Sequence, residues 1–255
     1  MTMQRLDRLL VEQGLAESRT QAQNWIAQGR VFVAGQAQAL TKNSLKLALE
    51  TPLHLQTDPT QEQYVSRAGH KLAALLEAQA LSLTGHYVLD IGQSTGGFTD
   101  CALQAGAAFV VGVEVGHSQL AKKLQGHAQL TTFEGMNARY LSQDARKILG
   151  CIPVDAFDDV VMDVSFISQS LIFPELHSVT RSGSRLLSLI KPQFEVGKAA
   201  LGKKGIVKDR VAAQNACQRL ILHLQHLGWQ VLHFMPSPIQ GGDGNQEFLI
   251  YAQRQ

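Results

Sequence analysis

The sequence has few of the features that mark a secreted, membrane-bound or metal-binding protein. Its three cysteines, Cys101, Cys151 and Cys217, are scattered and odd in number, which suits neither a disulfide framework nor a CxxC metal site. No apolar run approaches the roughly 20 residues of a membrane helix. The opening stretch MTMQRLDRLL places charges where a signal peptide has an apolar core. We therefore expect a cytoplasmic protein with no membrane segment and no metal site.

An excess of charge of one sign is also lacking. The 23 Lys and Arg residues nearly balance the 21 Asp and Glu residues, which gives a formal net charge of +2. That charge is too small to indicate a polyanionic partner by itself. The 255 residues, 45% of them hydrophobic, suffice for one large domain or for a medium domain with a small companion. A nucleic-acid surface must be sought in local clusters of basic side chains.

The N-terminal segment differs in character from the rest. Apolar residues recur at helical spacing in RLDRLLVEQGL, where Gly14 fits a helix end. Ser18 is a plausible N-cap for a second helix, RTQAQNWIAQG, which Gly29 ends. RVFVAGQAQA and TPLHLQT are typical of short strands. We expect a small α+β domain over residues 1–58 and a polar linker over 59–63.

From Tyr64 onward, expected strands alternate with expected helices. The strands are YVLDI, FVVGVEV, DVVMDV, RLLSLI, WQVLHFM and EFLIYA. The helix-like segments between several of them include KLAALLEAQ, SQLAKKL, SFISQSLIFPEL and VAAQNACQRLILHLQHL. This alternation predicts an α/β domain over residues 64–255, with a doubly wound, mostly parallel, Rossmann-like sheet covered on both faces.

The stretch VLDIGQSTGGFTD joins a strand to a glycine-rich turn that opens a helix. Glycines allow close backbone approach, and amides at a helix N-terminus favour an anion. The dinucleotide spacing GxGxxG is absent, which disfavours NAD and FAD as cofactors. An acidic residue at the end of each of two successive strands suits S-adenosylmethionine instead, because the second acid can bind its ribose. The alternative is a purely structural strand–turn–helix corner. The candidate cofactor residues are Asp90, Gly92, Gln93, Thr95, Gly96, Gly97, Phe98 and Glu114.

A phosphate-binding loop is nearly present in GKAALGKK, residues 197–204. Lys204 stands where a Ser or Thr hydroxyl would hold magnesium. The chain continues as GIVKD rather than as an apolar helix. We therefore do not expect a nucleoside triphosphatase.

Four charged residues occupy positions from which they can converge. Lys71 starts a helix, Asp163 and Lys191 follow strands, and Glu247 begins one. Neighbouring strand ends line one cleft in a doubly wound sheet. Methyl transfer to a hydroxyl needs a base for a very weak acid, and a lysine can serve once a second cation or burial disfavours its charge. Each residue alone could be an ordinary surface charge; together they predict a catalytic group.

Two absences narrow the methyl acceptor. The stretch after the fourth strand is DVSFIS, which lacks the Pro-Pro-aromatic clamp usual for methylation of base amines. Methylation of a carbon needs a cysteine nucleophile in the cleft, but Cys151 precedes that strand. A hydroxyl acceptor is the best remaining fit.

The N-terminal segment resembles the S4 RNA-binding module through RLDRLL, AESRTQAQNWI and GRVFVAG. The resemblance implies that basic side chains of the two helices and the following hairpin contact RNA, as phosphate contacts rather than base readers. Nearby acids leave a solvated helix face as the alternative. The candidates are Arg5, Arg8, Arg19 and Arg30.

The whole chain resembles the hemolysin TlyA family, which joins an S4 module to an FtsJ-like ribosomal RNA methyltransferase domain. The matching stretches are YVSRAGHKL, LDIGQSTGGFTD, GVEVGHSQLAKKL, MDVSFIS, LIKPQFEVGK, GIVKD and PSPIQGGDGNQEFL. The resemblance implies 2′-O-methylation of cytidine ribose in ribosomal RNA. It carries the FtsJ-like tetrad Lys-Asp-Lys-Glu over to Lys71, Asp163, Lys191 and Glu247, with Lys191 as the base. Asp163 and Asn137 join the cofactor contacts.

Two positions depart from the family pattern. Gln93 stands where a serine is common, and Glu114 stands where an aspartate is common. Glu114 keeps the same chemistry with one more methylene. Gln93 could narrow the glycine turn and weaken the binding of the cofactor.

A basic stretch over residues 191–210 is expected to grip RNA phosphates beside the cleft, or else to be a solvated loop. The partners would be ribosomal RNA or ribosomal subunits, and we expect a monomer. The alternative is a non-catalytic ribosome assembly factor with the same fold; a membrane-active hemolysin lacks the necessary segments. The further RNA-binding candidates are Arg67, Lys198, Lys203 and Lys204.

Overall fold

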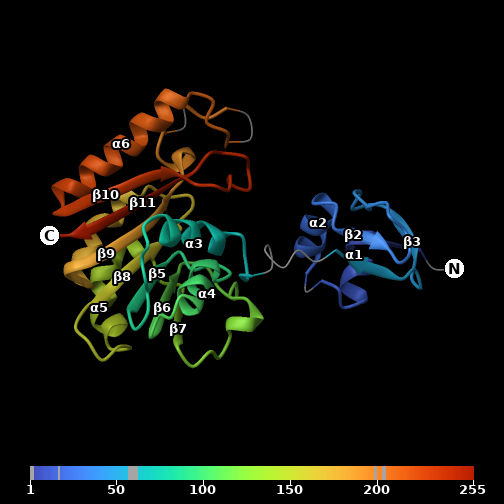
Figure 1. Cartoon of the computed structure of the whole chain (residues 1–255), viewed down its shortest axis with the longest axis horizontal. Coiled ribbons are helices and arrows are strands. Elements are labelled where there is room, and N and C mark those ends of the chain that lie inside the picture. The colour runs from blue at the N-terminus through green and yellow to red at the C-terminus, as the bar shows by residue number, and fades with distance from the viewer. Residues whose placement is uncertain (1–2, 17, 57–62, 198–199, 203–204) are drawn as a thin grey trace. The chain divides into compact units, whose positions relative to one another are not determined.

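A computed structural model describes residues 3–16, 18–56, 63–197, 200–202 and 205–255. The chain divides into two compact units, Met1–Gln63 and Tyr64–Gln255 (Figure 1). Of the linker expected over 59–63, residues 59–62 lie outside the described residues. Within the described ranges, none of the helices has the length and apolar character needed to cross a membrane.

The N-terminal unit packs two helices over two small sheets. Ser18 caps the second helix as expected, because its Oγ accepts a hydrogen bond of 3.2 Å from the Gln21 amide. The core lies between the helices and includes the buried side chains of Leu6, Leu10 and Ile26. The elements are α1 (Leu6–Glu12), α2 (Arg19–Ala27), and the antiparallel pairs β1 (Met3–Arg5) with β3 (Lys46–Ala48) and β2 (Val31–Val33) with β4 (Leu53–Leu55).

The second unit is built on a seven-stranded sheet in the order β10-β11-β9-β8-β5-β6-β7. The strands from β7 to β9 in that order are parallel, and β11 runs antiparallel to β9 and β10. The predicted doubly wound sheet is confirmed. Its strands are β5 (Tyr87–Ile91), β6 (Phe109–Glu114), β7 (Leu130–Glu134), β8 (Phe157–Met162), β9 (Thr180–Ile190), β10 (Trp229–Pro236) and β11 (Phe248–Arg254).

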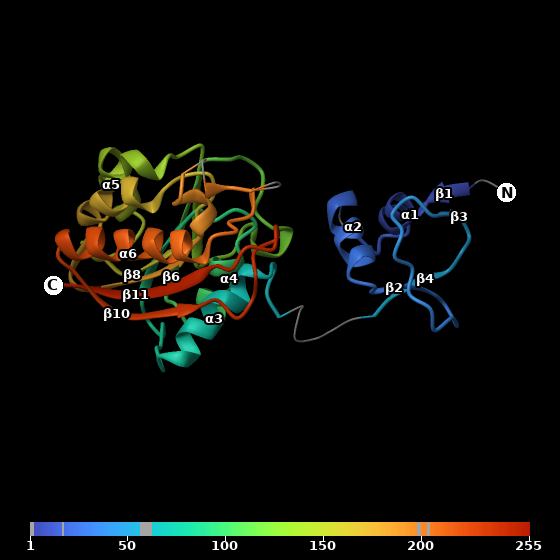
Figure 2. The ribbon, with the colours of Figure 1, turned by 90° about the horizontal axis from the view of Figure 1, so that it is seen from above.

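Helices cover both faces of this sheet. On one face, α3 (Ala68–Ala78) and α4 (Gly97–Gln104) bury leucines and Phe98 against β5 and β6. On the other face, α5 (Leu141–Leu149) and α6 (Arg210–His226) cover a second apolar cluster. Figure 2 shows α5 and α6 on the opposite side of the sheet from α3. The sheet is thereby buried on both faces, as parallel strands require.

Some local expectations were wrong. SQLAKKL contains only a short 3-10 helix, η1 (Lys122–Leu124), and SFISQSLIFPEL forms two, η3 (Gln169–Leu171) and η4 (Phe173–Ser178). Pro174 lies in the first turn of η4, where it has no amide to donate. The prediction also omitted β7 and α5. β7 is a half-exposed edge strand of sequence LTTFE, so it lacks the apolar run used to find strands.

Candidate active site

The site lies at the carboxyl ends of β5 and β8. From β5, the chain forms β6 and β7 on one side of that strand and then β8 and β9 on its other side. The strand order therefore reverses at β5, and a crevice opens between the carboxyl ends of β5 and β8. Gly92, with φ of +81°, directly follows β5, and a Cβ atom there would lie 2.7 Å from the backbone oxygen of Asp163. Glycine is therefore needed here to bring the turn against the end of β8.

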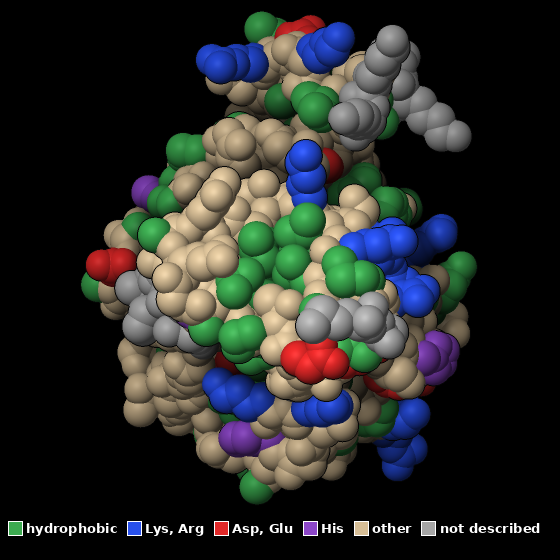
Figure 3. Space-filling view, turned by 90° about the vertical axis from the view of Figure 1, so that its right-hand side faces the viewer, with side chains coloured by type: hydrophobic (Ala, Val, Ile, Leu, Met, Phe, Trp, Pro, Cys, Tyr) green, Lys and Arg blue, Asp and Glu red, His purple; other side chains and the backbone are tan. Residues whose placement is uncertain are grey.

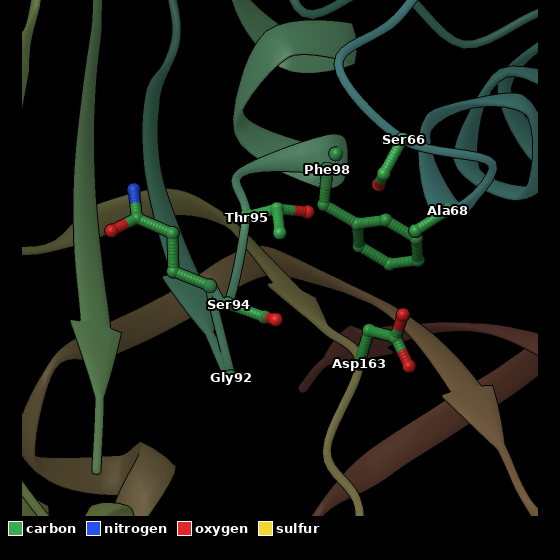
Figure 4. Close-up of a pocket in the computed structure, with 9 residues that line it drawn as sticks. Ser66, Ala68, Gly92, Ser94, Thr95, Phe98 and Asp163 are labelled. Atoms are coloured by element: carbon green, nitrogen blue, oxygen red, sulfur yellow. The ribbon is translucent and has the colours of Figure 1, made fainter. Parts of the chain in front are cut away.

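A pocket occupies this crevice. Ser66 and Ala68, from the segment that leads into α3, form one wall of the pocket. Ser66 comes close to the turn because residue 97 is a glycine: a Cβ atom on Gly97 would lie 2.2 Å from Ser66 Oγ. Figure 4 shows the ring of Phe98 between Thr95 and Ala68, with the Asp163 carboxylate close by. The sequence interpretation missed Ser66, Ala68 and Ser94, although all three lie within the quoted motifs. The lining residues are Ser66, Ala68, Gly92, Gln93, Ser94, Thr95, Gly97, Phe98 and Asp163.

Asp90 lies behind the pocket and is fully buried. Its Oδ2 accepts a hydrogen bond of 2.6 Å from the Thr99 hydroxyl, which accepts one of 2.9 Å from Gln93 Nε2. Burial raises the pKa of Asp90 to about 7, and the charges of Asp163 and Glu114 add to that effect, although the Thr99 hydrogen bond opposes it. Asp90 thus supports the turn through Thr99 and Gln93, and at neutral pH its carboxyl group is close to its pKa.

The remaining cofactor candidates, Gly96, Glu114 and Asn137, are not among the residues that line the pocket. Gly96 caps α4 with φ of +91°. Glu114 is nearly buried, and its two oxygens accept the Ser94 amide at 2.8 Å and the Gly116 amide at 2.7 Å. Asn137 is exposed, and its Oδ1 caps the 3-10 helix η2 (Ala138–Tyr140) through the Arg139 amide at 3.1 Å. Glu114 therefore adjoins the turn through Ser94.

The four predicted catalytic residues form two ion pairs. Lys71 Nζ lies 2.5 Å from Glu247 Oε2, with both side chains buried. Lys191 Nζ lies 2.7 Å from Asp163 Oδ1, with side chains 12% and 15% exposed. Because Phe248 pairs with Ile190 across β11 and β9, Glu247, just before β11, and Lys191, just after β9, lie side by side. Asp163 also lines the pocket, so one carboxylate joins the pocket to a lysine.

Two further residues beside Lys191 were not predicted. Ser165 Oγ accepts a hydrogen bond of 2.8 Å from Lys191 Nζ. Phe166 adopts a left-handed backbone with φ of +64°, is 91% exposed, and has its ring centroid 5.0 Å from that of Phe194. A bulky residue rarely adopts this conformation. The available signal was the phenylalanine in DVSFIS, three positions after the strand-end acid Asp163.

The cysteines give no nucleophile at the pocket. Burial raises the pKa of the Cys101 thiol, on α4, to about 12, and it raises that of Cys217 to about 12. Both thiols therefore stay protonated at neutral pH. Among the residues that the structure describes, His, Cys, Asp and Glu form no cluster that could hold a metal ion.

The candidate RNA-binding arginines of the N-terminal unit differ in their surroundings. Arg5 and Arg19 converge on the buried carboxylate of Asp7, with side chains 40% and 49% exposed. Arg8 is exposed. Arg30 lies 5.6 Å from the Trp25 ring and donates to the Gln56 carbonyl. In the other unit, Arg67 is exposed just before α3, whereas Lys198, Lys203 and Lys204 lie outside the described residues.

The doubly wound sheet, with β11 antiparallel and a glycine turn after its switch-point strand, defines the second unit as a class I methyltransferase domain. Residues 64–254 match the FtsJ-like methyltransferase family, and residues 4–37 match the S4 domain. The chain belongs to the FtsJ-like methyltransferases, within the TlyA group that carries an S4 domain. The predicted family is confirmed.

Similar proteins support this membership along the full length. The "Putative rRNA methyltransferase YqxC" of Bacillus subtilis is 40% identical over 97% of this chain and 85% of its own. The 16S/23S rRNA (cytidine-2′-O)-methyltransferase TlyA of Mycobacterium tuberculosis is 38% identical over 98% and 90%. A solved structure, "Putative hemolysin from Streptococcus thermophilus", is 35% identical with a TM-score of 0.76, covering 100% of this chain and 90% of that one.

Proposed function

We propose that this chain methylates the 2′-hydroxyl of a cytidine ribose in ribosomal RNA, with S-adenosylmethionine as the methyl donor. The observation that carries the proposal is the double role of Asp163, which lines the pocket and pairs with Lys191 at 2.7 Å. A base held at the edge of a cofactor pocket suits proton removal from a hydroxyl beside the methyl donor. The names of the relatives, among them an rRNA (cytidine-2′-O)-methyltransferase, support the substrate.

The pocket residues fit the amino-acid end of S-adenosylmethionine. The glycine turn brings backbone close to a ligand, Ser66, Ser94 and Thr95 offer hydroxyls, and the Asp163 carboxylate can accept from an ammonium group. Buried Oδ1 of Asp90 has no hydrogen-bond partner among the described atoms, so the wall behind the turn retains an acceptor. Glu114 would hold the ribose. When bound, the cofactor supplies an electrophilic methyl group on its sulfonium.

Lys191 is the proposed base. Its neutral amine takes the proton of the ribose 2′-hydroxyl, and the Asp163 carboxylate forms an ion pair with the ammonium so formed. The proton then passes to solvent, since the Lys191 side chain keeps a partly exposed edge. Asp163 thereby orients the lysine and stabilises the charge that develops on it.

The pair of Lys71 and Glu247 is assigned a positioning role. Lys71 lies in the first turn of α3, whose entry segment carries the pocket residues Ser66 and Ala68. Glu247 directly precedes β11, beside the end of β9 that leads to Lys191. Their ion pair therefore ties the pocket wall to the strand ends that hold the base.

The N-terminal unit is assigned RNA binding. Arg5, Arg8 and Arg19 keep exposed guanidinium surface, which suits contacts with phosphates. Figure 3 shows Lys and Arg side chains on the surface of the protein. Phosphate contacts of this kind make affinity fall as salt rises, so the enzyme would bind ribosomal RNA in a salt-dependent manner.

The test is transfer of labelled methyl from S-adenosylmethionine to ribosomal subunits. The wild type and Lys147→Ala, which alters an exposed lysine of α5, should both label rRNA at a ribose. Lys191→Ala should lose at least about a hundredfold in rate while its affinity for S-adenosylmethionine, measured by calorimetry, stays unchanged. Binding of the cofactor without transfer by the wild type would instead favour a non-catalytic assembly factor.

A further inference from the structure

The Nζ atom of Lys191 contacts two oxygen atoms in different ways. Asp163 Oδ1 lies 2.7 Å away in an ion pair, but this oxygen has no hydrogen-bond partner among the described atoms. Ser165 Oγ accepts a hydrogen bond of 2.8 Å from Nζ. A neutral primary amine carries two hydrogens and one lone pair. A hydrogen held by a fixed acceptor restricts rotation about the Cε–Nζ bond, and so restricts the direction of the lone pair.

We propose that Ser165 is a positioning residue, which holds one hydrogen of Lys191 so that the lone pair of the amine faces the ribose 2′-hydroxyl. This inference rests on the proposed function, because it concerns the base of that reaction. Ser165 takes no proton from the substrate. It restricts the rotation of the group that does, which contributes to the rate through orientation.

The backbone around Ser165 is held in place against the loop that carries Lys191. Phe166 adopts its left-handed conformation directly after Ser165 and places its ring beside Phe194. Two residues farther on, Ser168 Oγ donates to Glu195 Oε2 at 2.6 Å, and the Gln169 amide donates to Glu195 Oε1 at 3.0 Å.

These contacts join the segment after β8 to the segment after β9 at several points. A left-handed backbone is strained for a phenylalanine, so the surrounding contacts must compensate for that strain. A serine on such a constrained turn can keep its hydroxyl near Lys191 before RNA arrives. Ser165 is itself exposed, so in the RNA-free protein water competes for its hydrogen bond, and the expected effect on the rate is moderate.

The experiment compares Ser165→Ala with Ser165→Thr, which keeps a hydroxyl, and with Ser142→Ala, which alters an exposed serine of α5. Single-turnover methyl transfer is measured with saturating S-adenosylmethionine and ribosomal subunits. Calorimetry gives the affinity for S-adenosylmethionine. The ammonium resonance of Lys191, assigned by its loss in Lys191→Arg, is recorded by NMR on the cofactor-free protein, and thermal unfolding checks the fold.

We expect Ser165→Ala to lower the single-turnover rate about tenfold with unchanged melting temperature and cofactor affinity. Its Lys191 ammonium signal should exchange faster with water, and Ser165→Thr should restore both the rate and the signal. An active wild type with an equally active Ser165→Ala overturns the inference, as does a threonine variant as slow as the alanine variant. An inactive wild type overturns the proposed function, and the inference with it.

Discussion

The side-chain amide of Gln93 occupies the space in which any residue other than glycine at position 112 would place its Cβ atom. That atom would lie 2.1 Å from Gln93 Nε2 and 2.2 Å from its Cδ. Gln93 is 3% exposed and donates to Thr99, which in turn donates to Asp90. A glycine on β6 and a glutamine in the cofactor turn thus form one structural unit. The glutamine points inward, where Gly112 leaves room for it.

Gly112→Ala should therefore destabilise the protein by about 1–3 kcal/mol, as overpacking does, and weaken its affinity for S-adenosylmethionine. The added methyl group must displace Gln93, which disturbs the turn. In a Gln93→Ala background the same substitution should cost much less, because the clash is removed. Denaturant unfolding and calorimetry of the four proteins form a double-mutant cycle; strictly additive effects would contradict the coupling.

A second prediction concerns the dependence of stability on pH. Because the folded-state pKa of Asp90 is raised to about 7, well above its ordinary value near 3.9, the folded protein retains a proton that the unfolded chain has lost. The stabilisation from this group is complete below pH 4 and disappears as pH rises toward 7. Asp90→Asn cannot ionise, so its unfolding free energy should fall less steeply over this interval.

The difference in slope should approach about 1.4 kcal/mol per pH unit between pH 5 and pH 6. Denaturant titrations at half-unit steps measure it, in the absence of cofactor. Other carboxylates titrate in both proteins and cancel in the comparison. Parallel curves for wild type and Asp90→Asn would mean that the carboxyl is already ionised in the folded state.

Much of the fold and part of the site could be predicted from the sequence. The strands β5 and β6 are nearly continuous apolar runs, and β8 and β9 end in the apolar runs VVM and LLSLI, because these parts are buried on both faces of the sheet. The edge strand β7 gives no such run and was missed. The convergence of Asp163 and Lys191 followed from a rule about strand ends, which needs no side-chain detail.

Contacts between loops could not be predicted in the same way. Ser66 reaches the pocket because Gly97 leaves room for it, and Ser165 reaches Lys191 from a turn with a left-handed Phe166. Neither of these two contacts produces a periodic pattern in the sequence. Gln93 was expected to narrow the turn, and its inward orientation depends on Gly112, a residue that lies 19 positions away in the sequence.

A third prediction concerns Asp7 in the N-terminal unit. Its buried carboxylate accepts hydrogen bonds from Arg5, Arg19 and Gln23, and the Arg5 guanidinium in particular holds the pKa of Asp7 well below its usual range. Asp7→Asn should lower the unfolding free energy of this unit by about 1–2 kcal/mol, since it weakens hydrogen bonds from two arginines whose side chains stay partly solvated. The exposed Glu12→Gln should change it by no more than about 0.5 kcal/mol.

Tryptophan fluorescence can follow this unit separately, because Trp25 lies in α2 and a Trp229→Phe background removes the signal of the other unit. A carboxyl group whose pKa is lowered in the folded state stabilises the protein at pH values above its unfolded-state pKa. That contribution is lost as the pH falls through the folded-state pKa. The Trp25 transition of the wild type should accordingly weaken below about pH 4, and that of Asp7→Asn should change less. Equal acid sensitivity in the two proteins would contradict the assignment.

The last prediction concerns Phe166. A side chain that is 91% exposed gains little from burial, and its φ of +64° costs free energy, so stability does not account for an aromatic residue here. Single-stranded or flipped bases stack on exposed aromatic rings, at about 1–3 kcal/mol per base. Phe166→Ala should raise KM for ribosomal subunits or lower kcat about tenfold or more, while Phe166→Tyr keeps activity. Melting temperature and affinity for S-adenosylmethionine should stay at wild-type values in both variants. A fall in stability without a change in KM or kcat would show that the ring serves the turn rather than the RNA.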